Sequence, residues 1–290
     1  MSLPWVQETL RQSLGPLPAS WHVEVMKEVD STSSELMRRG HRMNYRPTVL
    51  IAEHQTAGRG RSGKQWLSNA QQSITFSMAC SLAPMDWMGL SLACGVGVAR
   101  ALEAHLPQAL GSRPQLGLKW PNDIWAIDGD LSFKVGGLLI ETQSLRTDPS
   151  APEQTSLQTH LMDNAKARFC VLGLGLNLMT PSVEDSHRLS PPPLGLFEMG
   201  LTLASSAQKH NLLASIVLSL VQTLKQFETS GFASFKDEFE RFDCLKGKSV
   251  NLSDSRHGRA MGVNEQGALL LDIDGNIHLI QASEVSVRPE

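Results

Sequence analysis

The 290-residue chain lacks a long apolar run, clustered metal-ligand residues and a strong excess of charge of either sign. No apolar run reaches the roughly 18 residues that a helix needs to cross a bilayer, and the polar N-terminus contains no signal-peptide core. The formal net charge of −3 argues against a protein that coats nucleic acid, because such proteins carry a basic excess. We therefore expect a cytoplasmic protein whose partner is neither a membrane nor a nucleic acid.

Cysteine is scarce and dispersed. Cys80, Cys94, Cys170 and Cys244 form no CxxC pair, and the nine histidines form no HxH or HExxH pattern. Closely spaced ligands of this kind are typical of structural zinc sites. We therefore predict reduced thiols in the core and no structural metal.

Apolar patterning predicts both strands and helices. Strands are predicted at residues 48–53, 73–80, 116–120, 135–143 and 168–178, and helices at 89–105, 211–231 and 232–243. In the stretch 29–40, Thr32 and Glu35 fit a capping box that begins a short helix, and Gly40 fits its end. Residues 144–166 lose all periodicity, which indicates a mobile loop or an insertion.

Beyond residue 245 the chain becomes a series of short strand patterns separated by turn signals. Gln266-Gly267 and Asp274-Gly275-Asn276 are the clearest turns. An all-β segment of about 45 residues buries too little surface to be very stable alone. We predict a boundary that separates residues 1–244 from a small β domain, 245–290, docked on them.

The stretch GRGRSGKQW, residues 58–66, satisfies the beginning of a P-loop and also the G-x-G-x-x-G dinucleotide pattern. Both motifs need an apolar strand before the first glycine and a helix after it. Polar EHQTA precedes Gly58, Gln65 stands where a P-loop has Ser or Thr, and the residues that follow form helices poorly. Glycines that point N–H groups inward, with Arg59 and Arg61, still favour an anion-binding loop. The alternative is a solvated basic loop.

Three further motifs are each ambiguous alone. KWPND (119–123) presents polar side chains in a Pro-restricted turn or forms an ordinary Asx turn. Lys134 before Gly136 and Gly137 is either a cation beside an anionic ligand or a lysine that protects an edge strand. GLGLNL (173–178) is either tight strand–helix packing or a backbone wall against a flat ligand with Asn177 at its rim.

Together, DSTS (30–33), AEHQTAGRGRSGKQW (52–66), LKWPND (118–123), KVGGLLIE (134–141) and GLGLNL occur in an order that resembles the biotin protein ligase family. The resemblance runs from about Val29 to the C-terminus. It implies an α+β fold, a mixed sheet flanked by helices, followed by a small SH3-like β-barrel domain. Only 29 residues precede Asp30, too few for the family's winged-helix repressor domain, so we expect the monofunctional form.

The resemblance also implies a reaction. Biotin and ATP give biotinyl-5′-adenylate and pyrophosphate with Mg²⁺, and biotin then passes to one lysine of the biotin carboxyl carrier protein domain of a biotin-dependent carboxylase. The carboxylate of biotin must approach a phosphate, so cations are needed to suppress the repulsion. The substrate itself attacks, so no side-chain nucleophile is required.

By motif match, the resemblance assigns each site residue a role. Ser31, Thr32 and Gln55 bind the biotin ring system, and Ser33, in place of the family's usual asparagine, is a further ligand-binding residue that can also hydrogen-bond. Arg59, Gly60 and Arg61 close over biotin and the phosphate, and Trp66 stacks on adenine. Lys134 holds the carboxylate, Lys119, Asn122 and Asp123 line the nucleotide side, and Lys119 serves in the transfer. Gly137, Gly173, Gly175 and Asn177 border the ligand. The catalytic set is Lys134, Lys119 and Arg61, with no metal ligand assigned.

Two other functions stay open at this point. A lipoate or octanoate ligase shares the fold and a comparable lysine, although GRGRSGKQW and KWPND are associated with the biotin branch. A non-enzymatic sensor would bind biotin or its adenylate without reaction. A homodimer is possible, because family members associate through exposed sheet surfaces.

Overall fold

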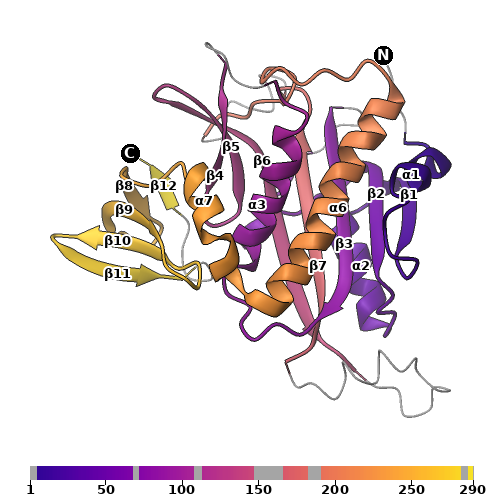
Figure 1. Ribbon diagram of the computed structural model, residues 1–290, viewed down its shortest axis with the longest axis horizontal. Helices are drawn as coiled ribbons and strands as arrows, with labels where there is room; N and C mark the ends of the chain where they lie inside the picture. The colour runs from indigo at the N-terminus through magenta and orange to yellow at the C-terminus, as the bar shows by residue number, and fades with distance from the viewer. Residues whose placement is uncertain are drawn as a thin grey trace.

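The computed structural model describes residues 5–67, 72–107, 113–146, 166–181, 191–281 and 287–289. Its centre is a seven-stranded sheet in the order β1-β2-β3-β7-β6-β5-β4 (Figure 1). Strands β1 and β2 run parallel, and all other neighbours are antiparallel. The strands are β1 (His22–Val29), β2 (Thr48–Gln55), β3 (Ser73–Leu82), β4 (Gln115–Lys119), β5 (Asp123–Asp128), β6 (Leu131–Ser144) and β7 (Arg168–Asn177).

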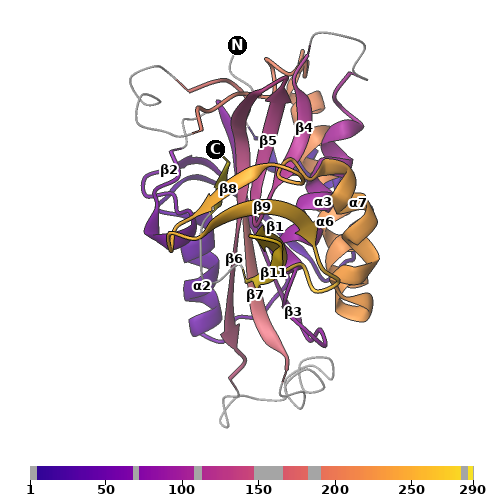
Figure 2. The same cartoon turned by 90° about the vertical axis from the view of Figure 1, so that its left-hand side faces the viewer.

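Helices cover the two faces of this sheet unequally. α3 (Leu90–Glu103) and α6 (Ser206–Ser230) lie on one face, and α2 (Thr32–His41) lies on the other (Figure 2). The short α1 (Gln7–Ser13) contacts α6 and β1. The predicted α+β fold, with a mixed sheet flanked by helices, is confirmed.

Side-chain alternation along β3 and β7 produces the two faces. The even-numbered residues Ile74, Phe76, Met78, Leu172, Leu174 and Leu176 are buried in one cluster with residues of α3 and α6. On the opposite face, Ala79 and Val171 pack against Leu36 of α2 in a smaller cluster. Further along this second face the odd positions become Ser77, Gly173 and Gly175. The face therefore changes from an apolar contact with α2 to a polar, glycine-rich surface.

A second sheet follows η2 (Phe232–Phe235) and α7 (Lys236–Phe242). Its strands are β8 (Ser249–Leu252), β9 (His257–Val263), β10 (Leu269–Ile273), β11 (Asn276–Ile280) and β12 (Val287–Pro289), antiparallel in the order β11-β10-β9-β8-β12. Positive φ angles at Gly267, Asp274 and Gly275 confirm the two predicted turns. Val250, Leu269 and other tail residues belong to the same hydrophobic cluster as the main core. The boundary at residue 244 stays a prediction.

Several predicted elements need correction. Ser31, not Thr32, caps α2, because its hydroxyl accepts the backbone N–H of Ser34, and the helix continues through Gly40 to His41. α6 begins five residues earlier than predicted, at Ser206, and the predicted helix 232–243 begins as a 3₁₀ turn. Of the predicted loop 144–166, residues 147–165 lie outside the described residues.

The four cysteines are free thiols, three of them buried. Within the described ranges, no helix combines the length and the apolar character needed to cross a bilayer.

Candidate functional site

Three glycines form a bare patch on the face of the sheet that α2 covers. Gly173 and Gly175 are two apart on β7, and Gly137 of β6 is the register partner of Gly175. A side chain at Gly173 would collide with the Ser33 hydroxyl, and one at Gly175 would collide with the Trp66 indole. A side chain at Gly137 would crowd Asp123. We call Gly137, Gly173 and Gly175 the glycine floor.

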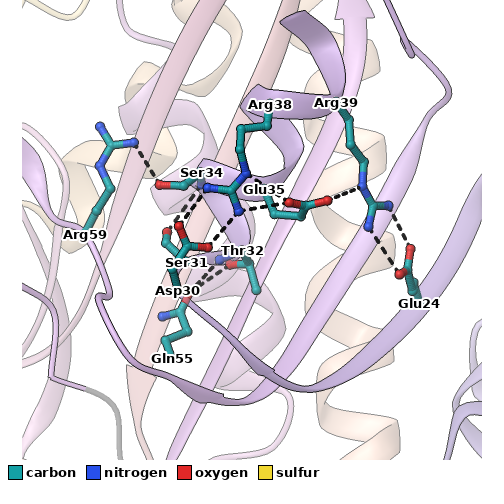
Figure 3. Close-up of polar contacts among 10 residues, drawn as sticks. All are labelled: Glu24, Asp30, Ser31, Thr32, Ser34, Glu35, Arg38, Arg39, Gln55 and Arg59. Carbon is teal, nitrogen blue, oxygen red and sulfur yellow. Dashed lines mark hydrogen bonds and ion pairs between the residues drawn. The ribbon is translucent and has the colours of Figure 1, made fainter. Parts of the chain in front are cut away.

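Hydroxyl and amide groups gather at the Gly173 end of the floor, where α2 begins. Figure 3 shows Thr32 and Gln55 side by side at this helix start. Thr32 donates its backbone N–H to Gln55 Oε1 at 2.8 Å and its hydroxyl to the same oxygen at 3.1 Å. The hydroxyl of Ser77 lies 2.7 Å from that of Thr32 and 2.9 Å from that of Ser33. All these side chains are buried. The structure thus brings together Thr32, Ser33 and Gln55 and adds Ser77, while Ser31 precedes them as the N-cap of α2.

Cations and amides gather at the Gly137 end. Asp123 Oδ1 accepts a hydrogen bond from Lys134 Nζ at 2.7 Å, and its Oδ2 lies 3.8 Å from Lys119 Nζ. Asn122 donates to the carbonyl of Leu138 at 2.7 Å. The Asn122 Oδ1 accepts from Arg61 at 3.1 Å, which brings a third cation to this end.

Of the three cations at the Gly137 end, Lys119 and Arg61 lie in surroundings that disfavour their positive charge. Burial lowers the pKa of Lys119, an effect that the neighbouring Asp123 partly opposes and Lys134 reinforces. Burial also lowers the pKa of Arg61, again opposed by Asp123. Lys119 is only 7% exposed and lies 5.5 Å from the centre of the Trp125 ring. Such buried charges add little to the stability of the fold. We therefore infer that Lys119 and Arg61 serve to bind an anionic ligand.

Residues 58–66 form a folded-back loop over the floor. Gly60 N donates to Lys64 O at 2.7 Å, and Trp66 N donates to Gly58 O at 2.9 Å. A side chain at Gly58 would collide with the carbonyl of Trp66, so the close approach requires glycine. β2 ends at Gln55, and Arg61–Gly63 form only one 3₁₀ turn. The strand–turn–helix context of a P-loop or a dinucleotide loop is therefore missing from the described residues.

The structure separates the two arginines that were predicted to act together. Arg59 donates to Glu141 of β6, with a closest distance of 2.7 Å, and to the Ser34 hydroxyl at 3.3 Å. Figure 3 shows it beside the first turn of α2. Arg61 instead points to Asn122. Arg59 thus anchors the loop to α2 and β6, whereas Arg61 reaches the cation end.

Two other predicted site residues have protein neighbours in this structure. The Trp66 indole lies on Gly175, and its N–H has no hydrogen-bond partner among the described residues. The Asn177 amide donates to the carbonyls of Lys134 and Leu194 at 3.4 and 3.5 Å. Asn177 therefore ties β7 to β6 and to the following segment, and the ligand contacts expected of both residues stay predictions.

Comparisons with known proteins agree on the family. The model of the biotin/lipoate A/B protein ligase family matches residues 25–150. The bifunctional ligase/repressor BirA of Escherichia coli is 30% identical over 283 residues, which cover 96% of this chain and 77% of that protein. The biotin–[acetyl-CoA-carboxylase] ligase of Mycobacterium tuberculosis is 28% identical, over 97% of this chain and 95% of that protein.

A solved structure extends this likeness to three dimensions. The biotin protein ligase from Aquifex aeolicus in complex with biotin and ATP has a TM-score of 0.67 and 25% identity, over 93% of this chain and 99% of that chain. The match therefore spans nearly the whole length of both chains. The chain therefore belongs to the biotin/lipoate A/B protein ligase family and, within it, to the biotin protein ligases.

Proposed function

We propose that this enzyme binds biotin and ATP on the glycine floor, forms biotinyl-5′-adenylate, and transfers biotin to a lysine of a biotin carboxyl carrier domain. The observation that carries the proposal is the polarity of the floor. Hydroxyl and amide groups lie at the Gly173 end, and Lys134, Lys119 and Arg61 lie at the Gly137 end. Biotin has the same polarity, with a ureido ring at one end and a carboxylate at the other.

In the first step, an oxygen of the biotin carboxylate attacks the α-phosphorus of ATP, and the bond to pyrophosphate breaks. Two anions must meet, so the barrier is mainly electrostatic. Lys134 is one-third exposed beside Gly137 and can move its ammonium from Asp123 to the reacting oxygens. Arg61 adds a second positive charge, and the loop that carries it covers the floor and keeps water from the mixed anhydride.

Magnesium fits this site only as a companion of the nucleotide. No group of three His, Cys, Asp or Glu side chains that could hold a metal is found in the described part of the chain. The nearest carboxylate, Asp123, is engaged by two lysines. Mg²⁺ commonly binds substrate phosphates with only one or two protein oxygens. Asp123 and the Asn122 amide oxygen are the residues that would supply them, and the ion would neutralise phosphate charge.

In the second step, the amine of the carrier lysine attacks the acyl carbon of the adenylate, an amide bond forms, and AMP leaves. Lys119 lies beside Asp123 at the cation end and would balance the charge that builds up on the departing phosphate. Acetyl-CoA carboxylase, named in the relative from Mycobacterium tuberculosis, supplies the natural candidate for the carrier.

The test is a labelling reaction with ATP, Mg²⁺, a carrier domain and either labelled biotin or labelled lipoate. We expect one labelled lysine on the carrier with biotin, and pyrophosphate release that requires biotin. Labelling by lipoate in place of biotin would reassign the chain to the lipoate branch. Tight biotin binding without pyrophosphate release would identify a sensor. Lys134→Met, which should bind but not react, is the control for a contaminating ligase.

A further inference from the structure

Ser77 is a buried hydroxyl that no motif singles out. It lies in the middle of β3, opposite Gly173 in the strand register, and is fully buried. Its oxygen is 2.7 Å from the Thr32 hydroxyl and 2.9 Å from the Ser33 hydroxyl. Gly173 makes the arrangement possible, because a side chain there would displace Ser33. Ser77 therefore joins two residues of the proposed biotin site from beneath.

The direction of each hydrogen bond in this group follows from counting hydrogens. Gln55 Oε1 accepts the backbone N–H of Thr32, which fixes the amide orientation, and it also accepts the single hydroxyl hydrogen of Thr32. Thr32 has no second hydrogen to give, so Ser77 must donate to Thr32. Ser77 then has none left, so Ser33 must donate to Ser77. The chain of donors runs from Ser33 through Ser77 and Thr32 to Gln55.

This direction determines what the two outer hydroxyls can offer a ligand. The hydrogen of Ser33 is committed to Ser77 and that of Thr32 to Gln55, so both oxygens have only lone pairs left. Such groups bind N–H donors and repel acceptors. A cyclic urea presents two N–H groups, whereas the dithiolane ring of lipoate presents none. Without Ser77, the Ser33 hydroxyl would be free to rotate and to donate, whereas Thr32 would still donate to Gln55.

We propose that Ser77 is a positioning residue that fixes Ser33 as an acceptor beside Thr32, which Gln55 fixes, and so makes the site selective for ureido N–H groups. The inference rests on the proposed function, since it assumes that the biotin ring meets these hydroxyls. Ser77 would thus influence which ligand is bound although it lies beneath the ligand site and acts only through its neighbours. A buried site built to pair with N–H groups rejects an analogue that lacks one.

The test compares biotin with its two cyclic carbamate analogues, in which one ring N–H is replaced by oxygen, in ATP–pyrophosphate exchange. We expect wild type to reject at least one analogue about tenfold or more, since one unpaired group costs about 1.4 kcal/mol or more. Ser77→Ala should raise the biotin KM, leave the ATP KM unchanged and lower this discrimination at least threefold, because the freed Ser33 hydrogen can donate to the ring oxygen. Ser77→Thr, which keeps the hydroxyl, should discriminate between biotin and the analogues as wild type does.

Ser219→Ala is the matched control, because that hydroxyl donates to the carbonyl of Gly97 on the opposite face of the sheet. It should leave the discrimination unchanged. If Ser77→Ala does not fold, Ser77→Cys carries the test and should also lower the ratio, because a thiol accepts only weakly from Ser33. An unchanged ratio in an active variant overturns the role of Ser77 and leaves the proposed function intact. A wild type without biotin-dependent exchange overturns the proposed function itself.

Discussion

At the scale of single residues, Lys119 places a positive charge at the site, and its burial there lowers the stability of the folded protein. Burial lowers its pKa from the ordinary 10.5, and Asp123 lies 3.8 Å away but is already bonded to Lys134. Replacing a buried, poorly paired charge by an apolar side chain of similar volume is often neutral or stabilising. We expect Lys119→Met to retain or raise the melting temperature while biotin transfer falls about 100-fold or more.

The pH dependence of this stability difference has a definite sign. The folded protein releases the Lys119 proton at a lower pH than the unfolded chain, so wild-type stability rises with pH between the lowered pKa and 10.5. Lys119→Met lacks this gain. Its advantage over wild type should be largest near pH 7 and shrink as the pH approaches 10. Urea unfolding at both pH values measures it, and an advantage that grows with pH would refute the argument.

Most residues of the site could be named from the sequence, because each stands in a motif with its own spacing. Ser77 and Glu141 could not. In SITFSMAC, Ser77 occupies a polar position of an alternating strand, which predicts exposure to water. Only the fold places the first turn of α2 over it. Glu141 similarly ends an apolar run, and its partner Arg59 is 82 residues away.

At the scale of elements, the loop 58–66 is held by an ion pair outside the ligand site. Arg59 bonds Glu141 of β6 with both terminal nitrogens, and its side chain is 46% exposed. An exposed pair contributes at most about 1 kcal/mol to folding, so its main effect is on the position of the loop. We expect Arg59→Gln and Glu141→Gln each to raise the biotin KM about three- to tenfold and to change the melting temperature little.

A double-mutant cycle separates this anchoring role from direct ligand contact. If Arg59 acts through Glu141, the double variant should be no worse than either single variant. If Arg59 leaves Glu141 to meet the adenylate phosphate, as the family resemblance implies, Arg59→Gln should be much more damaging than Glu141→Gln. The KM for biotin and the dissociation rate of biotinyl-adenylate are the quantities to compare.

Two of the closely predicted elements are buried on nearly every side. β7 and α3 were predicted to within two residues, because each is almost continuously apolar. β1 was not predicted, since HVEVMKEV mixes valine with charged residues. Its Glu24 pairs with Arg39 of α2 at 2.7 Å, which is a tertiary contact. Local sequence contains no signal for such a partner, so this edge strand escapes prediction.

At the scale of the whole molecule, the two sheets are joined at the KWPND turn. Trp120 is fully buried, and its indole N–H donates to the carbonyl of Gly267 in the β9–β10 turn at 3.0 Å. Two residues before Trp120, the Leu118 carbonyl accepts the N–H of Cys244 at 3.1 Å, just before the C-terminal sheet begins. The residues that flank Lys119 are thus held by the C-terminal part of the chain.

The contacts between the two sheets predict how the chain unfolds. Apolar residues of the C-terminal sheet belong to the same cluster as the main core, and a segment of that size buries too little surface to fold alone. We expect one cooperative thermal transition, with calorimetric and van't Hoff enthalpies equal. Trp120→Phe, which removes the N–H and part of a buried ring, should cost about 1–3 kcal/mol and keep the single transition. Two resolved transitions in wild type would show instead that the C-terminal sheet unfolds independently, and would remove its hold on the Lys119 turn.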